Sequence, residues 1–145
     1  MTRRVALITG GMGGIGTAVC KKLAQVNGNV VVANCLPGYE RKEDWLEGMD
    51  KEGYEVHAAE GDVSDFDSTS AMVRRIESEI GPVDILVNNA GIVRDNMLKK
   101  ASASDWMAVI NSNLNSVFNV TKNVIDGMTD RGWGRVVNMS SVNGQ

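Results

Sequence analysis

Short apolar runs alternate with longer amphipathic stretches along this chain, and the alternation predicts its secondary structure. Runs rich in valine, isoleucine and alanine are typical of strands buried within a sheet. The stretches between them repeat apolar residues at helical spacing, as at Met72, Ile76 and Ile80. The predicted strands are Val5–Ile8, Asn29–Ala33, Glu55–Glu60, Asp84–Val87 and Arg135–Met139. The predicted helices are Gly14–Gln25, Arg41–Glu52, Ser68–Ile80 and Ser104–Asp130.

Unbroken alternation of strands and helices implies right-handed crossovers and a parallel sheet covered on both faces. We therefore expect one α/β domain over residues 1–145, with a doubly wound sheet and no repeats or linker. The sequence stops shortly after the fifth predicted strand, which leaves one edge of such a sheet uncovered. We expect the chain to be the N-terminal part of a longer protein, truncated after that strand.

The helix predicted at Ser104–Asp130 is apolar on more than one side. One face carries Trp106, Ile110, Asn113, Val117, Val120 and Val124, and another carries Leu114, Phe118, Ile125 and Met128. A helix with two apolar faces is either deeply buried or shared with another subunit.

Composition narrows the functional classes. The apolar fraction of 43% and the charged fraction of 23% are those of an ordinary soluble protein. A net charge of −3 lacks the basic footprint of nucleic-acid binding, and no apolar run has membrane-spanning length. The residues after Met1 form no signal-peptide core, so we expect a cytoplasmic protein. Cys20, Cys35 and the single histidine, His57, have no metal-binding spacing, and no metal site is predicted.

A glycine-rich segment, Thr9-Gly10-Gly11-Met12-Gly13-Gly14-Ile15-Gly16, joins the first predicted strand to the first helix. Such a turn lets backbone approach a ligand, and the helix behind it directs free N–H groups toward a phosphate. The spacing fits either G-x-G-x-x-G or the rarer pattern Thr-Gly-x-x-x-Gly-x-Gly. The sequence favours a nucleotide site here; the alternative is a tight turn without a ligand.

Two later strands also end in small or polar residues. Asn88-Asn89-Ala90-Gly91 ends the fourth, and Asn138-Met139-Ser140-Ser141 ends the fifth. Open α/β sheets bind ligands at the carboxyl edge of their strands, where Ala90 and Gly91 leave room for a flat ring. These residues are expected to form the floor of a binding crevice.

In this order, the motifs resemble the short-chain dehydrogenase/reductase family from Thr2 to Gln145. The matching segments are Thr9-Gly10-x-x-x-Gly14-x-Gly16, Gly61-Asp62-Val63, Asn88-Asn89-Ala90-Gly91, Asn113-Leu114 and Ser141 before Val142. Gly11-Met12-Gly13-Gly14 and Asp130-Arg131-Gly132-Trp133-Gly134-Arg135 are further similar to the acetoacetyl-CoA reductases of polyhydroxyalkanoate synthesis. The resemblance implies a Rossmann-type fold and a nicotinamide cofactor.

The second strand favours NADP(H) over NAD(H). NAD sites place an acid at this strand end, whereas NADP sites use a nearby Arg for the 2′-phosphate. Here the strand ends at Asn34, and Arg41 follows in the next loop. Alternatively, Arg41 and Lys42 only solvate the next helix. The expected cofactor-binding residues are Gly10, Gly13, Gly14, Ile15, Gly16, Arg41, Gly61, Asp62, Val63, Asn89, Ala90, Gly91 and Ile92.

Within this set, Asp62 is expected to accept a hydrogen bond from the adenine amino group, with Val63 packed on the ring. The alternative is a turn that leads into a helix, in which Asp62 or Asp65 only caps that helix.

The resemblance implies roles for two further side chains. Asn113 would hold a water molecule on a proton relay; the alternative is an amide, buried in an apolar stripe, that bonds only to backbone. Ser141 would polarise the substrate carbonyl, with Ser140 as the competing candidate.

The family's general acid is a Tyr followed four residues later by a Lys. Tyr39 and Tyr54, the only tyrosines, are followed at that spacing by Glu43 and Ala58. We expect the acid beyond Gln145, so these 145 residues alone should not catalyse the reaction.

The resemblance implies reduction of a 3-oxoacyl thioester, with acetoacetyl-CoA giving (R)-3-hydroxybutyryl-CoA. Asp95 matches a substrate-side position, and Arg94, Lys99 and Lys100 are either contacts for CoA phosphates or solvated residues. One alternative is a reductase of the same ketone on acyl carrier protein; another is a non-catalytic nucleotide-binding half-domain. The resemblance also implies a homo-oligomer, expected to be a tetramer, with Ser104–Asp130 at an interface.

Overall fold

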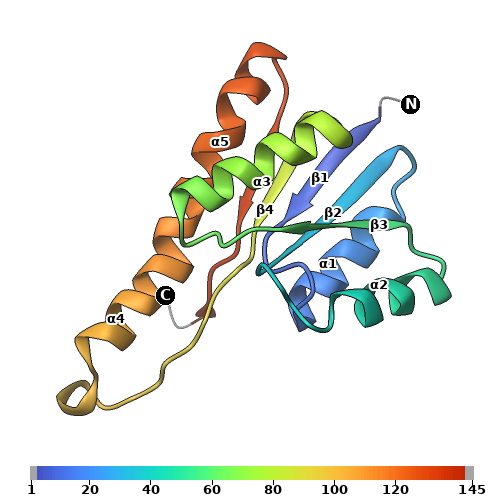
Figure 1. The fold of residues 1–145 in the computed structure, drawn as a ribbon. Coiled ribbons are helices and arrows are strands. Elements are labelled where there is room, and N and C mark those ends of the chain that lie inside the picture. Colours follow the sequence, from blue (N-terminus) through green and yellow to red (C-terminus); the bar gives the residue numbers. More distant parts are fainter. Residues whose placement is uncertain (1–2, 143–145) are drawn as a thin grey trace.

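The computed structural model describes residues 3–142, and strands within this range form one parallel sheet (Figure 1). The strands are β1 (Arg4–Ile8), β2 (Asn29–Cys35), β3 (Val56–Glu60), β4 (Val83–Asn88) and β5 (Arg135–Asn138). Their spatial order is β3-β2-β1-β4-β5, so the winding direction reverses between β1 and β4. In open sheets such a reversal opens a crevice at the carboxyl ends of the two strands.

Helices cover both faces of the sheet (Figure 1). On one face lie α1 (Gly14–Ala24) and α2 (Lys42–Lys51). On the other face lie α3 (Phe66–Glu79) and α5 (Ser116–Asp130), while α4 (Ala103–Ile110) extends beyond the sheet. The arrangement confirms the predicted doubly wound, Rossmann-type fold.

The sheet separates two apolar cores. Successive side chains of a strand point to opposite faces. Accordingly, Val5 and Leu7 of β1 pack in the core under α3 and α5, whereas Ala6 and Ile8 pack in the core under α1 and α2. Because β1 lies in the middle of the sheet and both its faces are covered, Ala6, Leu7 and Ile8 have no exposed surface.

Two predicted boundaries differ from the structure in ways that affect the site. Strand β2 continues beyond Ala33 to Cys35, because Asn34 and Cys35 pair with Ala59 and Glu60 of β3. The helix predicted at Ser104–Asp130 is interrupted by a π-helical turn, η2 (Asn111–Asn115), between α4 and α5. A short 3₁₀ helix, η1 (Leu98–Lys100), precedes α4 and was not predicted.

The apolar faces of α5 have different environments. Val120, Val124 and Met128 are buried against the sheet, so Met128 shares the face of Val120 and Val124 rather than the predicted face of Phe118 and Ile125. Phe118 and Ile125 remain exposed along a groove of about 470 Å³ between the helix and β5. No helix within residues 3–142 is both long and apolar enough to span a membrane.

A charged cluster joins the amino ends of β1 and β4, whereas the crevice lies at their carboxyl ends. The carboxylate of Asp84 accepts a hydrogen bond from the Val5 N–H at 3.2 Å. It lies 3.6 Å from the guanidinium of Arg4 and 3.4 Å from that of Arg131. Paired in this way, the buried carboxylate links β1, β4 and the turn after α5.

Candidate functional site

A cavity of about 480 Å³ lies at the carboxyl ends of β1, β2 and β4, where the winding direction reverses. Its lining is Gly10, Met12, Gly13, Ile15, Asn34, Cys35, Leu36, Tyr39, Asn89, Ala90 and Gly91. Six of the predicted cofactor-binding residues are in this lining, namely Gly10, Gly13, Ile15, Asn89, Ala90 and Gly91. The glycine turn and the end of β4 therefore face the same space, as the sequence predicted.

The glycine turn is shaped by two close backbone approaches. Gly10 has a φ of +59°, and a Cβ there would lie 3.0 Å from the Cα of Ala90. A Cβ on Gly16 would overlap the carbonyl oxygen of Gly10. By contrast, a Cβ on Gly14 would meet no atom within 4 Å. Gly16 therefore closes the turn from behind, while Gly14 faces open space at the start of α1.

The first turn of α1 can receive an anion. No side chain caps the helix at Gly13, and its first turn contains no acidic residue. The free N–H groups and the positive end of the helix dipole are directed toward the cavity side of the turn. A phosphate group of a nucleotide fits this environment because it would supply the missing hydrogen-bond acceptors.

Thr9 and Asn89 hold the glycine turn against the end of β4. The hydroxyl of Thr9 accepts hydrogen bonds from the N–H groups of Asn89 and Ala90, both at 2.9 Å. The amide of Asn89 donates in return to the carbonyls of Thr9 at 3.0 Å and Gly10 at 3.2 Å. This reciprocal set makes the two strand ends one unit, a role that the sequence motif did not specify.

Asn34, in β2, fastens the glycine turn to the end of β3. Its side-chain oxygen accepts from the Gly10 N–H at 3.2 Å, and its NH₂ group donates to the carbonyls of Ala59 at 3.3 Å and Gly61 at 2.9 Å. The residue is buried. Sequence reasoning considered only its lack of charge, whereas the structure shows a three-way link among β1, β2 and β3.

A smaller hollow of about 130 Å³ shares Met12 and Tyr39 with the main cavity and also contacts Arg41. Arg41 is exposed at the start of α2, and its guanidinium makes no ion pair or hydrogen bond within residues 3–142. Cys35, in the lining of the main cavity, contributes a neutral surface. Burial, reinforced by nearby Glu60, raises the pKa of its thiol. An anion entering this hollow would meet the Arg41 guanidinium, and also Asp44, which lines the hollow as well.

The residues after β3 lie beside the cavity rather than in its lining. Val63 is buried in the core under α3 and α5, and a Cβ on Gly61 would overlap Met72. The carboxylate of Asp62 accepts from the backbone and hydroxyl of Ser64 at 2.9 and 2.7 Å. It is Asp65 that caps α3. The roles of Asp62 and Val63 toward an adenine ring remain predictions.

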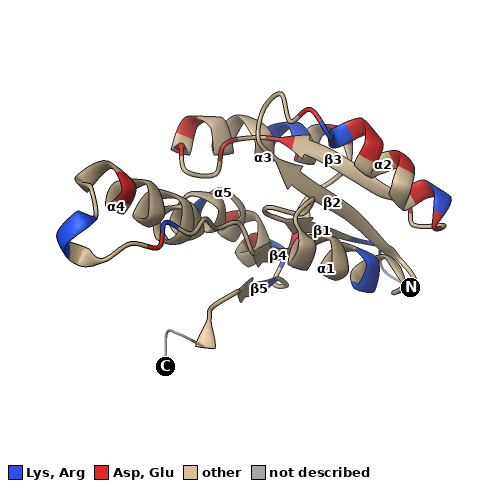
Figure 2. Ribbon diagram, turned by 90° about the horizontal axis from the view of Figure 1, so that it is seen from below, with Lys and Arg blue, Asp and Glu red and all other residues tan. Residues whose placement is uncertain are grey.

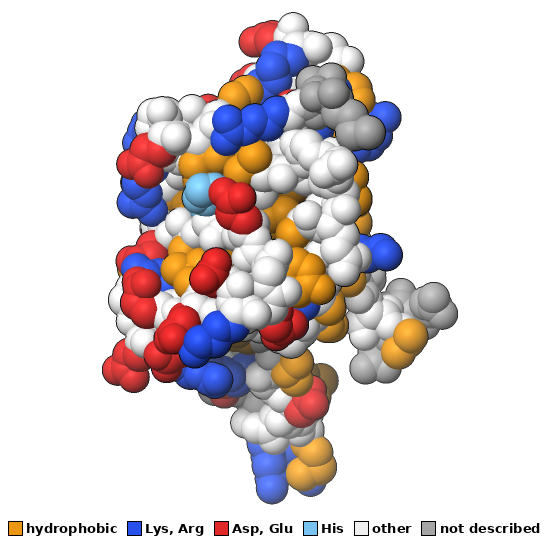
Figure 3. All heavy atoms as spheres, turned by 90° about the vertical axis from the view of Figure 1, so that its right-hand side faces the viewer, with side chains coloured by type: hydrophobic (Ala, Val, Ile, Leu, Met, Phe, Trp, Pro, Cys, Tyr) orange, Lys and Arg blue, Asp and Glu red, His pale blue; other side chains and the backbone are white. Residues whose placement is uncertain are grey.

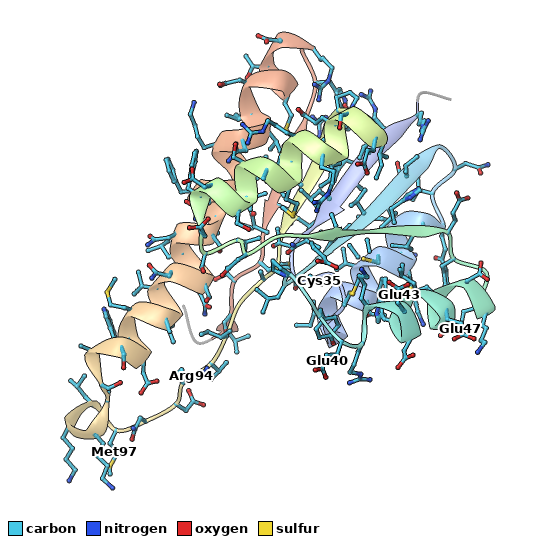
Figure 4. The ribbon with its side chains drawn as sticks, viewed as in Figure 1. Cys35, Glu40, Glu43, Glu47, Arg94 and Met97 are labelled. Carbon is cyan, nitrogen blue, oxygen red and sulfur yellow. The ribbon has the colours of Figure 1, made fainter. Side chains whose placement is uncertain are left out.

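A second cavity, of about 520 Å³, lies along the extended segment between β4 and α4. Ile92, Asp95 and Asn113 line it together with the exposed Trp106. Figure 4 places Arg94 on this segment and Met97 at its far tip, away from the sheet. Arg94 lies 3.8 Å from the carboxylate of Asp105, and Figure 2 shows basic residues at η1, beyond α4.

Asn113 connects this segment to the π-helical turn. Its oxygen accepts from the Ile92 N–H at 2.8 Å, and its NH₂ group donates to the Ile92 carbonyl at 2.9 Å. The expectation that Asn113 is buried is wrong, since the residue is exposed at the edge of the second cavity. Both polar ends of its amide are nevertheless occupied, which fixes the path of the chain as it leaves β4.

The end of β5 is held beside β4 by Asn88. Its side-chain NH₂ group donates to the Asn138 side chain at 2.9 Å and to the Thr121 hydroxyl at 3.1 Å, while its backbone carbonyl accepts from the Met139 N–H at 2.9 Å. Ser140 and Ser141 follow directly and are exposed. No group of three or more potential metal ligands occurs in the described part of the chain.

Comparisons with known proteins agree with this geometry. Residues 4–145 match the sequence model of the short chain dehydrogenase family. The chain is 57% identical over 145 residues to an acetoacetyl-CoA reductase of Cupriavidus necator, covering all of this chain and 58% of that protein. It is 38% identical over 142 residues to a 3-oxoacyl-[acyl-carrier-protein] reductase of Pseudomonas aeruginosa, covering 97% of this chain and 56% of that protein.

A solved structure supports the same assignment. The gluconate 5-dehydrogenase of Burkholderia cenocepacia, in complex with NADP and tartrate, superimposes with a TM-score of 0.85 at 35% identity, covering 100% of this chain and 56% of that one. The chain therefore spans little more than half the length of these relatives. It belongs to the short-chain dehydrogenase/reductase family.

Gly16 and Gly14 provide a matched pair for testing the turn. We expect Gly16→Ala to lower the midpoint of thermal unfolding by several degrees, because its Cβ would overlap the Gly10 carbonyl and force the turn apart. Gly14→Ala should leave the midpoint within about 2 °C, since its Cβ enters open space. Equal midpoints for the two variants, measured by differential scanning calorimetry, would contradict this description of the turn.

Proposed function

We propose that the full-length protein containing this chain is an NADPH-dependent reductase of 3-oxoacyl thioesters, with acetoacetyl-CoA as substrate and (R)-3-hydroxybutyryl-CoA as product. This activity would supply a precursor of polyhydroxyalkanoate. The observation that carries the proposal is the 57% identity to an acetoacetyl-CoA reductase over the whole chain. The convergence of three strand ends on one nucleotide-sized cavity is consistent with it.

The residues present fit a dinucleotide. The glycine turn and the uncapped start of α1 provide a cradle for the pyrophosphate, and a side chain at Gly16 would displace the turn. Ala90 and Gly91 form a shallow floor for a flat ring. We assign the 2′-phosphate to Arg41, because its guanidinium borders the adjoining hollow without a partner. Asn34, in the lining of the main cavity, carries no carboxylate, and Asp44 is the one acidic residue among those that line the hollow.

When bound, a reduced nicotinamide supplies the hydride that reduces the ketone carbon. Ser141 then donates a hydrogen bond to the ketone oxygen, which gains negative charge as the C–H bond forms. Asn113 fixes the chain at Ile92 and so sets the position of the substrate-side segment. The proton that completes the alcohol comes from the family's Tyr-Lys pair, which we place beyond Gln145.

The second cavity is our candidate for the acyl thioester. Asp95 and Ile92 line it, and the family resemblance places Asp95 on the substrate side. Lys99 and Lys100 follow Leu98, which lines this cavity, and we propose that their positive charge attracts the phosphates of acyl-CoA. Reduction of the same ketone on acyl carrier protein is the second candidate, favoured by the 38% identity to such a reductase.

The oxidation of NADPH at 340 nm tests the proposal directly. The full-length protein should turn over acetoacetyl-CoA with a kcat/KM at least tenfold above that for acetoacetyl-acyl carrier protein, as expected if the CoA phosphates are bound specifically. The opposite preference would support the acyl-carrier-protein alternative. NADPH binding without turnover of either thioester would contradict a reductase.

We also propose that the full-length protein assembles as a homo-oligomer, expected to be a tetramer, through the segment Ser104–Asp130. Apolar Leu114, Phe118 and Ile125 are exposed on one side of this segment, as at a subunit interface. A cytoplasmic location without membrane or nucleic-acid partners is consistent with the net charge of −3. Charges of both signs alternate on the face shown in Figure 3.

Arg41→Ala tests the assignment of the 2′-phosphate. Loss of the guanidinium should raise the KM for NADPH by on the order of tenfold or more, while the KM for NADH changes little, because NADH lacks the phosphate. Steady-state kinetics with both cofactors measure this difference. An equal effect on the two KM values would place phosphate recognition at another residue.

Ser141→Ala tests the catalytic assignment against its neighbour. A hydroxyl directed at the ketone oxygen stabilises the transition state more than the ground state, so its removal should lower kcat by on the order of 10²-fold. Ser140→Ala is the control and should retain most activity. Both variants should bind NADPH normally, as measured by fluorescence titration. A larger loss of kcat in Ser140→Ala would move the catalytic hydroxyl by one residue.

A further inference from the structure

Glu60, the last residue of β3, contacts both ends of the segment Gly38–Lys42, which carries Arg41. One carboxylate oxygen accepts a hydrogen bond from the Gly38 N–H at 3.2 Å. The other lies 2.7 Å from the ammonium group of Lys42, at the start of α2. Figure 4 labels Cys35 at the end of β2, Glu40 on the segment that follows it and Glu43 in α2.

The other backbone hydrogen bonds of the segment are local. Within it, the Tyr39 N–H donates to the Leu36 carbonyl at 3.2 Å, and the Lys42 N–H donates to the Tyr39 carbonyl at 3.1 Å. Gly38 adopts a φ of +70°, and a Cβ there would meet no atom within 4 Å. The chain is therefore unpacked at Gly38, whereas Tyr39 packs against the core under α1 and α2 and the Arg41 carbonyl accepts from the Trp45 N–H at 3.0 Å. The two contacts with Glu60 connect the segment to β3.

Glu60 is itself a fixed anchor. Its backbone pairs with Cys35 in the sheet, and its carbonyl accepts a hydrogen bond from the Arg75 guanidinium at 2.8 Å. The hydrogen bonds from Lys42 and Gly38 also lower the pKa of its carboxyl group. The carboxylate is thus charged at neutral pH and held on an element that does not move with the loop.

We propose that Glu60 is a positioning residue for recognition of the 2′-phosphate: by fixing Gly38 and Lys42, it holds Arg41 at the hollow beside Met12 and Tyr39. The inference rests on the proposed NADPH preference. Lys42 does not compete for the phosphate, because its ammonium group is already engaged by Glu60 at 2.7 Å and by Glu43 at 3.3 Å. Among residues 3–142, the Arg41 guanidinium has no such partner and borders the hollow.

A simple electrostatic view gives the opposite expectation. A carboxylate near a bound phosphate repels it, so removing Glu60 would strengthen NADP⁺ binding. Glu43 is the control that separates loss of negative charge from release of the segment. Its carboxylate also contacts Lys42, but the Gly38 N–H donates to Glu60 and not to Glu43. Removing either residue deletes one negative charge, whereas only the loss of Glu60 releases the loop.

The first experiment compares Glu60→Ala with the control Glu43→Ala in the full-length protein. Isothermal titration with NADP⁺ and NAD⁺ reports binding without turnover. Glu60→Ala should weaken NADP⁺ by on the order of tenfold, the effect of losing a charged hydrogen-bond anchor, and change NAD⁺ by less than about twofold. Glu43→Ala should change neither by more than about twofold. Tighter or unchanged NADP⁺ binding in Glu60→Ala would overturn the inference.

A double-mutant cycle then tests whether Glu60 acts through Arg41. In an Arg41→Ala background, Glu60→Ala should change NADP⁺ affinity by less than about twofold, because there is no guanidinium left to position. A full loss in that background would assign Glu60 a general structural role and overturn the inference. If Arg41→Ala alone leaves NADP⁺ affinity unchanged, the proposed cofactor assignment fails instead.

The conservative variant Glu60→Gln provides a second measure. Its amide oxygen can still accept from the Gly38 N–H, but it cannot form an ion pair with Lys42. Its NADP⁺ affinity should lie between those of the wild type and Glu60→Ala. If Glu60→Ala does not fold, the same cycle with Glu60→Gln decides the question, and an NADP⁺ affinity equal to wild type would overturn the inference.

Discussion

The geometry of the site depends on the hydrogen bonds that meet at Gly10. Its N–H is held by Asn34, its carbonyl accepts from Asn89, and its Cα lies against Ala90. Three parallel strands are therefore tied at one residue, directly where the winding direction reverses. The side chains involved are short and largely buried, so the crevice is defined by backbone position more than by flexible groups.

The two parts of the proposed site differ in how firmly they are built. The cofactor side joins β1, β2 and β4 through buried or half-buried amides and hydroxyls. The substrate side is an extended segment fastened at Ile92 by the amide of Asn113, with Val93 and Leu98 beyond it largely exposed. Under the proposed function, such a division would let a rigid cradle hold the dinucleotide while a less constrained wall receives the acyl thioester.

Much of the fold and part of the site followed from the sequence. Apolar strands buried on both faces and the glycine turn after Ile8 are strong local signals; the structure confirms the strands, and the comparisons with known proteins confirm the family. The contacts of Asn34 and Glu60 were missed, because they depend on the pairing of β2 with β3. An amide ending an apolar strand, as at Asn34, was the one available clue.

The π-helical turn shows the limit of periodicity arguments. A helical stripe placed Asn113 within one continuous helix, Ser104–Asp130, and predicted it to be buried. The extra residue in the turn and the capture of Ile92 bring it to the edge of the second cavity instead. Contacts between residues far apart in sequence decide this environment, and no local pattern encodes them.

A crystal structure of the full-length protein with NADP⁺ tests the central claim most directly. The account predicts the pyrophosphate at the start of α1, against Gly13 to Gly16, and the 2′-phosphate within hydrogen-bond distance of Arg41. Dinucleotide density outside the crevice between β1 and β4, or a 2′-phosphate directed away from the segment between β2 and α2, would contradict it.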